Sequence, residues 1–568
     1  MDIKKLIAAA RGDISADLVL ANARIVNTFT GEIEEGNVAV YQGRIAGVGD
    51  YSNAKKTVDL KGRYLSPGLI DGHVHIESSY LHVDQYARAI VPHGTLAVVT
   101  DLHEVANVCG LEGMRYIMEC GRKMPLDIFF MSPSCVPATD METSGARLGP
   151  EELRQTMRWS GVIGLGEMMN FPGVINASDD VVAKIQAVGS HPKDGHAPRV
   201  RGKALNAYLS PLIGSDHETT SYEEGLEKLR RGMRLMIREG STEKNLEELL
   251  PLVTDGNYHR CMLVVDDRNA KDLVRDGDLD AVVRKAIKLG LDPVRAVQMA
   301  TLNTAIWFKL DGYGGIGPGY HANMLVLDDL ESFKIHQVYY QGNLVAQDGK
   351  ALFKQTLPAN DKMMRTVNIK PFDVKRLALK VGLRDSFPVI EIIPGQIVTK
   401  RTEVKASRNN GTVVPDVERD LLKLVVVERH KATGNIGVGL VKGFGLKKGA
   451  LASTFAHDSH NVIVVGTNDE DIYMAVKEVE RNQGGLAVVA DGKVLGSLPL
   501  PIAGLLSPEP LEKVAATLEE LERLAAGLGC KAPSPFSVLS FMALPVIPEL
   551  KLTDMGLVDV TRAEFVKV

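Results

Sequence analysis

The sequence predicts an α/β protein with three parts: a TIM-type (β/α)8 barrel, a composite small β-sandwich domain and an additional C-terminal α/β domain. Two observations predict it. Between residues 67 and 310, short apolar strands alternate with helical stretches, and the length fits a parallel barrel of about 250 residues. Short β-like runs lie on both sides of this segment.

The first part of the small β-sandwich is expected in residues 1–66. The runs 17–27 (DLVLANARIVN), 37–49 (NVAVYQGRIAGVG) and 56–68 (KTVDLKGRYLSPG) cluster β-branched residues and break at Gly, as strands do. Residues 311–358 return to β character. The simplest expectation is that they are the second part of the sandwich and join the N-terminal strands in one sheet.

Residues 67–310 are expected to form a metal-dependent barrel. Strands are predicted at 96–102 (LAVVTDL), 127–132 (DIFFMS) and 161–167 (GVIGLGE), and helices at 110–123 and 221–240 (SYEEGLEKLRRGMRLMIREG). Residues 359–568 are expected to form the C-terminal domain. Its first half is β-rich, with 378–382 (ALKVG), 389–401 and 420–430, and residues 512–529 predict a helix.

Composition excludes several classes of protein. A net charge of -5 leaves no basic surface for nucleic acid. The five cysteines are far apart, with no C-x-x-C pair, which argues against disulfides and against a cysteine-built zinc site. The N-terminal apolar run is too short for a secretory signal, and no apolar stretch reaches the roughly 18 residues of a membrane span. We therefore expect a cytoplasmic protein with no membrane partner.

The motif PGLIDGHVHIESS carries the strongest chemical signal. His73 and His75 lie at positions i and i+2 of an apolar strand, so both imidazoles face the same side. They fall at the C-terminal end of the strand, where TIM barrels build their active sites. A single His is more often structural, but a pair with this placement favours metal ligation.

Further candidate ligands follow later strands. They are Glu167 in VIGLGE, His196 in KDGHAP, His217 in GSDHE, and Asp266 or Asp267 in CMLVVDD. Four imidazoles with two carboxylates provide enough ligands for two divalent ions. This mixed nitrogen and oxygen set suits manganese, iron or zinc.

Charged residues also follow the second predicted strand: Asp101, His103 and Glu104. Buried charges destabilise a fold unless they are paired or used, so these residues are expected to be functional. The alternative is that they only support the histidine ligands. His457 and His460, in AHDSHN, have no role that spacing alone assigns; a polar loop that helps to close the site is one hypothesis.

These motifs resemble the amidohydrolase superfamily: HxH after an apolar strand, single histidines on two later strands and an aspartate on the last. GHVHIESS, TDLHEVANVCG, GLGEMMNFPGV, IIPGQIVTK, AHDSHNVIVVG and FMALPVIPELKLTD resemble bacterial adenine deaminases more specifically, and they cover the whole chain. Two positions depart from the wider superfamily pattern. Glu167 replaces the carbamylated Lys of many relatives, as it does in adenine deaminases, and Asn323 stands where Asp is commoner.

The resemblance implies hydrolytic deamination of adenine to hypoxanthine and ammonia in purine salvage, an attack on the C–N bond of a cyclic amidine by a metal-bound hydroxide at a binuclear centre. It implies two divalent ions, with Mn²⁺ first and Fe²⁺ or Zn²⁺ as alternatives. It assigns proton transfer on the purine ring to Glu104, and Asp266 becomes the general base, with Asp267 as the alternative. Ser78, Asp101, His103 and Glu218 are expected to bind substrate or support the ligands. A homodimer is expected on the same ground.

Two rival functions remain open. Another amidohydrolase could act on a different heterocyclic amine or a cyclic amide at the same site, although Glu167 counts against the cyclic amidases. A catalytically inactive hydrolase-like assembly protein is the rival from another class. It should have lost ligands, and every expected ligand is present.

Overall fold

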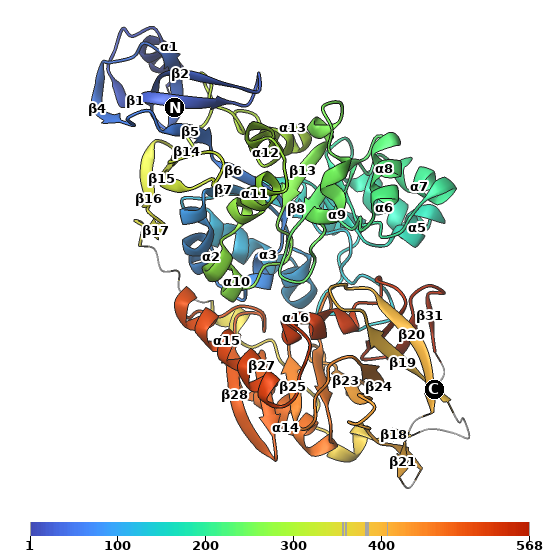
Figure 1. The fold of residues 1–568 in the computed structure, drawn as a ribbon. Coiled ribbons are helices and arrows are strands. Elements are labelled where there is room, and N and C mark those ends of the chain that lie inside the picture. The colour runs from blue at the N-terminus through green and yellow to red at the C-terminus, as the bar shows by residue number, and fades with distance from the viewer. Residues whose placement is uncertain are drawn as a thin grey trace.

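The computed structural model describes residues 2–354, 357, 360–380, 386–405, 407–409 and 411–566. In Figure 1 the chain forms a small sheet at the top, a barrel in the middle and a C-terminal region below. Among the described residues, no helix is long and apolar enough to cross a membrane.

Strands from two distant segments share the small sheet. After helix α1 (Ile3–Ala10), the first segment provides β1 (Ala16–Asn27), β2 (Glu32–Tyr41), β3 (Arg44–Gly49), β4 (Ala54–Asp59) and β5 (Tyr64–Pro67), and the second provides β14 (Met324–Leu327), β15 (Ile335–Tyr340), β16 (Asn343–Gln347) and β17 (Lys350–Ala351). The nine strands follow the order β17-β16-β15-β14-β5-β1-β2-β3, with β4 beside β1. The antiparallel pairing of β14 with β5 joins the segments, as the sequence predicts.

Eight parallel strands form the barrel. They are β6 (Leu69–Val74), β7 (Thr95–Asp101), β8 (Asp127–Ser132), β9 (Val162–Met168), β10 (Lys193–Gly195), β11 (Ser215–Asp216), β12 (Arg234–Arg238) and β13 (Cys261–Val264). The first five form one sheet in sequence order and the last three another. The Gly214 amide donates to the Lys193 carbonyl at 3.1 Å, and the Asp266 amide to the His73 carbonyl at 3.0 Å. These bonds connect both seams, so the predicted barrel is confirmed.

Helices cover the outside of the barrel (Figure 1). They are α2 (Val83–Ile90), α3 (His103–Gly121), α4 (Pro150–Thr156), α5 (Phe171–Ile175), α6 (Asp179–Ala187), α7 (Gly202–Leu209), α8 (Tyr222–Arg230), α9 (Leu246–Leu249), α10 (Ala270–Asp276), α11 (Leu279–Lys288), α12 (Pro293–Met299) and α13 (Leu302–Phe308).

One helix prediction is wrong in its second half. Residues 221–240 were expected to form a single helix, but α8 ends at Arg230 and Arg234–Arg238 is strand β12. Gly232 adopts a φ of +90°, a left-handed conformation that ends the helix. The five residues RLMIR then pair in parallel with β11 and β13, so tertiary pairing overrides their helical pattern.

The C-terminal region centres on an eight-stranded sheet in the order β20-β19-β24-β23-β26-β25-β27-β28. Its strands are β19 (Ser386–Ile392), β20 (Thr399–Lys405), β23 (Leu422–Val427), β24 (Ile436–Lys442), β25 (Ala450–Ser453), β26 (Val462–Gly466), β27 (Gly485–Ala490) and β28 (Lys493–Pro499). Two smaller sheets contain β18 (Leu379–Lys380), β21 (Arg408–Asn409) and β22 (Thr412–Val413), and β29 (Leu550–Thr553), β30 (Gly556–Asp559) and β31 (Glu564–Phe565). Of the predicted run 378–382, residues 381 and 382 lie outside the described residues.

Among the residues that the structure describes, this region has three α-helices: α14 (Asp469–Arg481), α15 (Leu511–Gly527) and α16 (Pro535–Ser540). The second confirms the predicted helix at 512–529. After α16 comes a short 3-10 helix, η7 (Phe541–Ala543).

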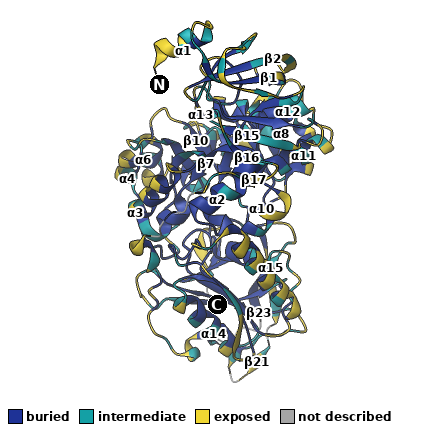
Figure 2. Cartoon of the chain, turned by 90° about the vertical axis from the view of Figure 1, so that its left-hand side faces the viewer, coloured by how far each residue is buried: buried dark blue, intermediate teal, exposed yellow. Residues whose placement is uncertain are grey.

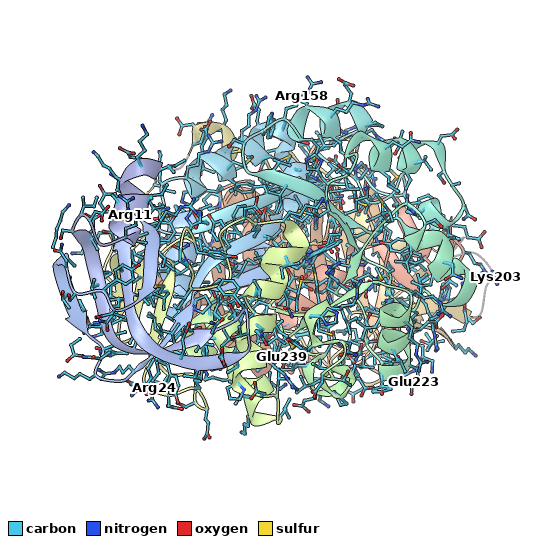
Figure 3. All side chains as sticks on the ribbon, turned by 90° about the horizontal axis from the view of Figure 1, so that it is seen from above. Arg11, Arg24, Arg158, Lys203, Glu223 and Glu239 are labelled. Atoms are coloured by element: carbon cyan, nitrogen blue, oxygen red, sulfur yellow. The ribbon has the colours of Figure 1, made fainter. Side chains whose placement is uncertain are left out.

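One apolar core continues from the barrel into the C-terminal region, where β23, β25, β26 and β27 are buried throughout (Figure 2). Tyr80 of the barrel and Phe455 of the C-terminal region meet edge to face, with ring centroids 5.4 Å apart. By contrast, Arg158, Lys203 and Glu223 lie exposed on the outer surface (Figure 3). The contact between Tyr80 and Phe455 shows that the C-terminal region packs on the barrel end where the predicted site residues lie.

Candidate metal centre

The six predicted metal ligands lie together at the C-terminal ends of the barrel strands. They come from five strands or from the residues that follow them: His73 and His75 (β6), Glu167 (β9), His196 (β10), His217 (β11) and Asp266 (β13). All six side chains are buried, each at most 5% exposed. Strand order alone brings them together, because every parallel strand ends on the same face of a barrel.

The first group of donors combines two imidazoles with two carboxylates. His73 Nε2 lies 3.8 Å from Glu167 Oε1 and 3.6 Å from Asp266 Oδ1. His75 Nε2 lies 3.3 Å and 3.4 Å from the same two oxygens. Atoms that share an ion at about 2.0–2.2 Å are separated by about 3–4 Å, so this spacing fits one cation.

The second group uses the other oxygen of Glu167. His196 Nδ1 lies 2.5 Å from Glu167 Oε2, and His217 Nε2 lies 3.3 Å from it. Glu167 thus faces both groups, one oxygen to each.

The histidines fit ligation in a second respect. His73 Nδ1 lies 3.1 Å from Asp194 Oδ2, and the buried Nε2 that faces Glu167 and Asp266 has no hydrogen-bond partner among the described residues. A carboxylate behind one ring nitrogen orients the other nitrogen toward a metal. Asp194 was not predicted; it lies on β10, two residues before the predicted ligand His196.

The electrostatics of the cluster favour cations. Burial alone would raise the pKa of Glu167, but the charge of His217 and the hydrogen bond with His196 hold it well below its usual range. Burial opposes protonation of His73, yet the hydrogen bond with Asp194 and the charge of Asp266 raise its pKa to about 9. Ionised carboxylates thus draw positive charge into a buried site, which suits divalent ions.

Asp266 and Asp267, between which the sequence could not choose, have different neighbours in the structure. Asp266 faces the ligand histidines, and Arg238 Nη1 donates to its other oxygen, Oδ2, at 2.7 Å. Asp267 points elsewhere: it accepts a hydrogen bond from Ser78, and its Oδ2 lies 3.7 Å from His457 Nε2.

Arg238, at the end of β12, is a site residue that the sequence interpretation missed. Its side chain is 2% exposed and also binds both oxygens of Glu218, at 2.6 and 3.0 Å. Such a bidentate pair fixes the geometry of the carboxylate as well as neutralising it. Arg238 was overlooked because RLMIR was assigned to a helix, so no strand end was expected at this position.

Two further predicted residues support the cluster. The Asp101 carboxylate accepts the backbone N–H of Glu167 at 2.8 Å and that of His103 at 3.2 Å. The His103 ring lies between two carboxylates, with its Nδ1 3.7 Å from Glu167 Oε1 and its Nε2 3.5 Å from Glu104 Oε1.

Glu104 is fully buried and contacts the C-terminal region. His457 Nδ1 lies 2.6 Å from Glu104 Oε1, and His460 Nε2 makes a short hydrogen bond with Oε2. Burial alone would raise the pKa of Glu104, but the neighbouring rings of His457, His460 and His103 hold it well below its usual range. The two histidines that spacing left without a role are therefore brought to a predicted catalytic residue.

A narrow pocket of about 20 Å³ opens at the cluster. Its polar side includes all the predicted ligands except His73, together with Glu104, Asp267 and His457, and its apolar side includes Met169, Phe541, Leu544 and Ile547. Phe541 stacks on His457, with centroids 4.4 Å apart and an interplanar angle of 15°. An apolar wall opposite polar groups suits a flat heterocycle, although a volume near that of one water requires the wall to move when a ligand enters.

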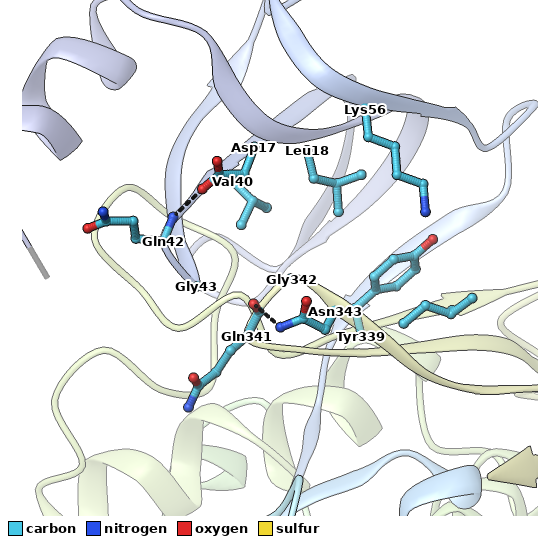
Figure 4. Close-up of a pocket in the computed structure, with 11 residues that line it drawn as sticks. Asp17, Leu18, Val40, Gln42, Gly43, Lys56, Tyr339, Gln341, Gly342 and Asn343 are labelled. Carbon is cyan, nitrogen blue, oxygen red and sulfur yellow. Dashed lines mark hydrogen bonds between the residues drawn. The ribbon is translucent and has the colours of Figure 1, made fainter. Parts of the chain in front are cut away.

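A larger cavity of about 470 Å³ lies elsewhere, in the small sheet (Figure 4). Asp17 there accepts the backbone N–H of Gln42 at 2.8 Å and pairs with Lys55 at 2.7 Å, while Gln341 and Asn343 form the opposite side. The predicted site residues all lie outside it. Chemistry rather than size therefore identifies the cluster at the barrel mouth as the candidate site.

Fold and site together define a class: a metal-dependent hydrolase built on a parallel α/β barrel. Residues 64–345 match the amidohydrolase family, and residues 396–564 match the adenine deaminase C-terminal domain. Curated relatives match over nearly the whole chain. An adenine deaminase from Dehalococcoides mccartyi is 59% identical over 100% of this chain and 99% of its own length. One from Desulfatibacillum aliphaticivorans is 50% identical over 99% of each.

The chain belongs to the adenine deaminase family of amidohydrolases. Solved structures of lower similarity include an adenosine deaminase from Xanthomonas campestris with bound zinc, at 14% identity and a TM-score of 0.46 over 60% of this chain and 95% of that chain.

Proposed function

We propose that this protein is an adenine deaminase, which converts adenine and water to hypoxanthine and ammonia. The observation that carries the proposal is the complete donor set at the barrel mouth of a chain that is 59% identical, over its whole length, to a relative named adenine deaminase. A protein that had lost the activity would not need to keep six buried ionisable side chains around one space.

The proposed cofactor is a pair of divalent ions. His73, His75, Glu167 and Asp266 would hold one ion, and Glu167, His196 and His217 the other, with Glu167 shared. The donors suit Mn²⁺, which we propose first, and Fe²⁺ or Zn²⁺ as alternatives. Such ions lower the pKa of a bound water from about 15.7 to about 7, and so provide hydroxide at neutral pH.

Asp266 is proposed as the general base that later acts as an acid. It takes the remaining proton of the attacking hydroxide and passes it to the departing ammonia, while the proton released when water becomes hydroxide offsets the one that Glu104 gives to the ring. Burial alone would raise the pKa of Asp266, but the hydrogen bond with His75 and the charge of Arg238 hold it well below its usual range, so the group is ionised before reaction. Asp267 differs, because burial and the charge of Asp266 raise its pKa.

Glu104 is proposed to deliver a proton to a ring nitrogen of adenine while the amino-bearing carbon is attacked. It is ionised at rest, so it must first receive a proton. The nearest source is His457, whose pKa is lowered by burial but raised overall to about 9, chiefly by the charges of Glu104 and Asp267. Ser78, Asp101, His103 and Glu218 are proposed to hold the reacting groups in place.

The test is a substrate panel. Purified protein loaded with Mn²⁺ is incubated with adenine, adenosine, guanine, cytosine and a hydantoin, and ammonia release is followed with the ultraviolet change to hypoxanthine. Turnover of adenine that a chelator abolishes is the expected result. A sample shown to contain about two metals per chain that leaves adenine unchanged would overturn the proposed substrate.

A role in purine salvage and a homodimer are proposed on family resemblance alone, and the cytoplasmic location expected from the sequence stays a proposal. Light scattering on the eluted protein measures the oligomeric state directly.

A further inference from the structure

The turn between β25 and β26 brings two histidines of the C-terminal region to Glu104. His457 and His460 are both buried, and each contacts a different oxygen of the same carboxylate. The two contacts are not equivalent. His457 lines the pocket, whereas His460 lies behind Glu104, with 0% of its side chain exposed.

The hydrogen bonds of His460 determine which of its nitrogens carries the proton. The backbone N–H of Ala456 donates to His460 Nδ1 at 3.1 Å, so Nδ1 is an acceptor without a proton. The proton is therefore on Nε2, which donates to Glu104. Burial lowers the pKa of His460 to about 4, consistent with a neutral ring.

The ring of His460 is also fixed by its backbone. The His460 N–H donates to the Ala456 carbonyl at 2.8 Å, and its own carbonyl accepts a short hydrogen bond from Arg429 Nε. Arg429 is itself fully buried and donates to the Ala503 carbonyl at 3.1 Å. A donor held this firmly allows the carboxylate that it binds little freedom of orientation.

We propose that His460 is a positioning residue for deamination: as a fixed neutral donor, it holds Glu104 in the orientation from which Glu104 transfers a proton to the substrate. The proposal rests on the proposed role of Glu104. It makes the C-terminal region part of the catalytic machinery, because a barrel without that region would leave Glu104 free to turn.

The test compares His460→Leu with His460→Gln, and each with the same change in a Glu104→Gln background. Loss of the donor should lower kcat by about 100-fold with KM and metal content unchanged, since a misplaced catalytic group costs about that much. Gln keeps an N–H donor near the position of Nε2 and should recover most of the kcat. In the Glu104→Gln background, His460→Leu should lower kcat no further, because both residues act through the same carboxylate.

His82 provides the matched control. It is buried like His460 and pairs with a carboxylate, its Nδ1 lying 2.8 Å from Asp84 Oδ1, but Asp84 lies outside the pocket that Glu104 lines. His82→Leu should lower the melting temperature without lowering kcat. Losses of kcat from His460→Leu that are equal with and without Glu104, or no loss at all, would overturn the proposal.

A second readout does not depend on turnover. The melting temperatures of wild type, both single variants and the double variant form a cycle, and the two losses should be non-additive, since the residues are in contact. If the wild type does not deaminate adenine, the proposed function fails. The cycle of melting temperatures then still tests whether His460 and Glu104 interact, and additive losses would show that they do not.

Discussion

The metal cluster and the Glu104 cluster lie next to each other in one pocket, but they are assembled differently. The metal cluster uses six side chains at the ends of strands within a single barrel. The Glu104 cluster uses one side chain from the barrel and two from residues more than 350 positions away. The difference indicates that the proposed metal site depends on the barrel alone, whereas the proposed proton transfer depends also on how the C-terminal region packs on the barrel.

The largest effect is expected from Glu167→Gln, which removes the carboxylate that both donor groups share. Turnover should fall below detection, and bound metal, measured by elemental analysis, should fall with it. A variant that keeps two metals per chain would show that the two donor groups do not depend on Glu167. The proposed account of the metal cluster would then be wrong.

Glu104→Gln should cost roughly 100-fold or more in kcat, the usual contribution of a general acid. Metal content should stay at the wild-type level, because Glu104 lies outside both donor groups. Wild-type turnover in this variant would contradict the assigned role while leaving the metal site intact.

Asp194→Asn tests the residue that lies behind the proposed ligand His73. The amide can no longer accept the His73 Nδ1 proton as a charged partner, so metal affinity should fall by about 10- to 100-fold, measured by titration with Mn²⁺. Activity should return at saturating metal. If excess metal does not restore activity, Asp194 acts on more than the orientation of His73.

Phe541→Ala should give the smallest effect, because it removes a ring that stacks on His457 and lines the pocket. The loss of about 0.5–1.5 kcal/mol predicts a rise in KM of roughly 2- to 13-fold with little change in kcat. Ile306→Ala, an exposed apolar residue on α13, is a control that should leave KM unchanged. A fall in kcat for Phe541→Ala alone would show that the wall also orients His457.

Most residues of the metal cluster could be predicted from the sequence, but few contacts of the Glu104 cluster could. His73, His75, Glu167, His196, His217 and Asp266 each lie at or just after the end of a barrel strand, and parallel strands bring their ends together without further information. Arg238 was missed because Gly232, which ends α8, was included in a continuous helix. His457 and His460 could not be placed, because no local pattern specifies a contact across two separate sheets.

The most direct test of the central claim is a titration of metal-free protein with Mn²⁺, in which bound metal and adenine turnover are measured on the same samples. The account predicts that activity rises with bound metal and saturates at about two ions per chain, the stoichiometry of a site with a shared carboxylate. Full activity in the metal-free protein, or no turnover of adenine at full occupancy, would contradict it.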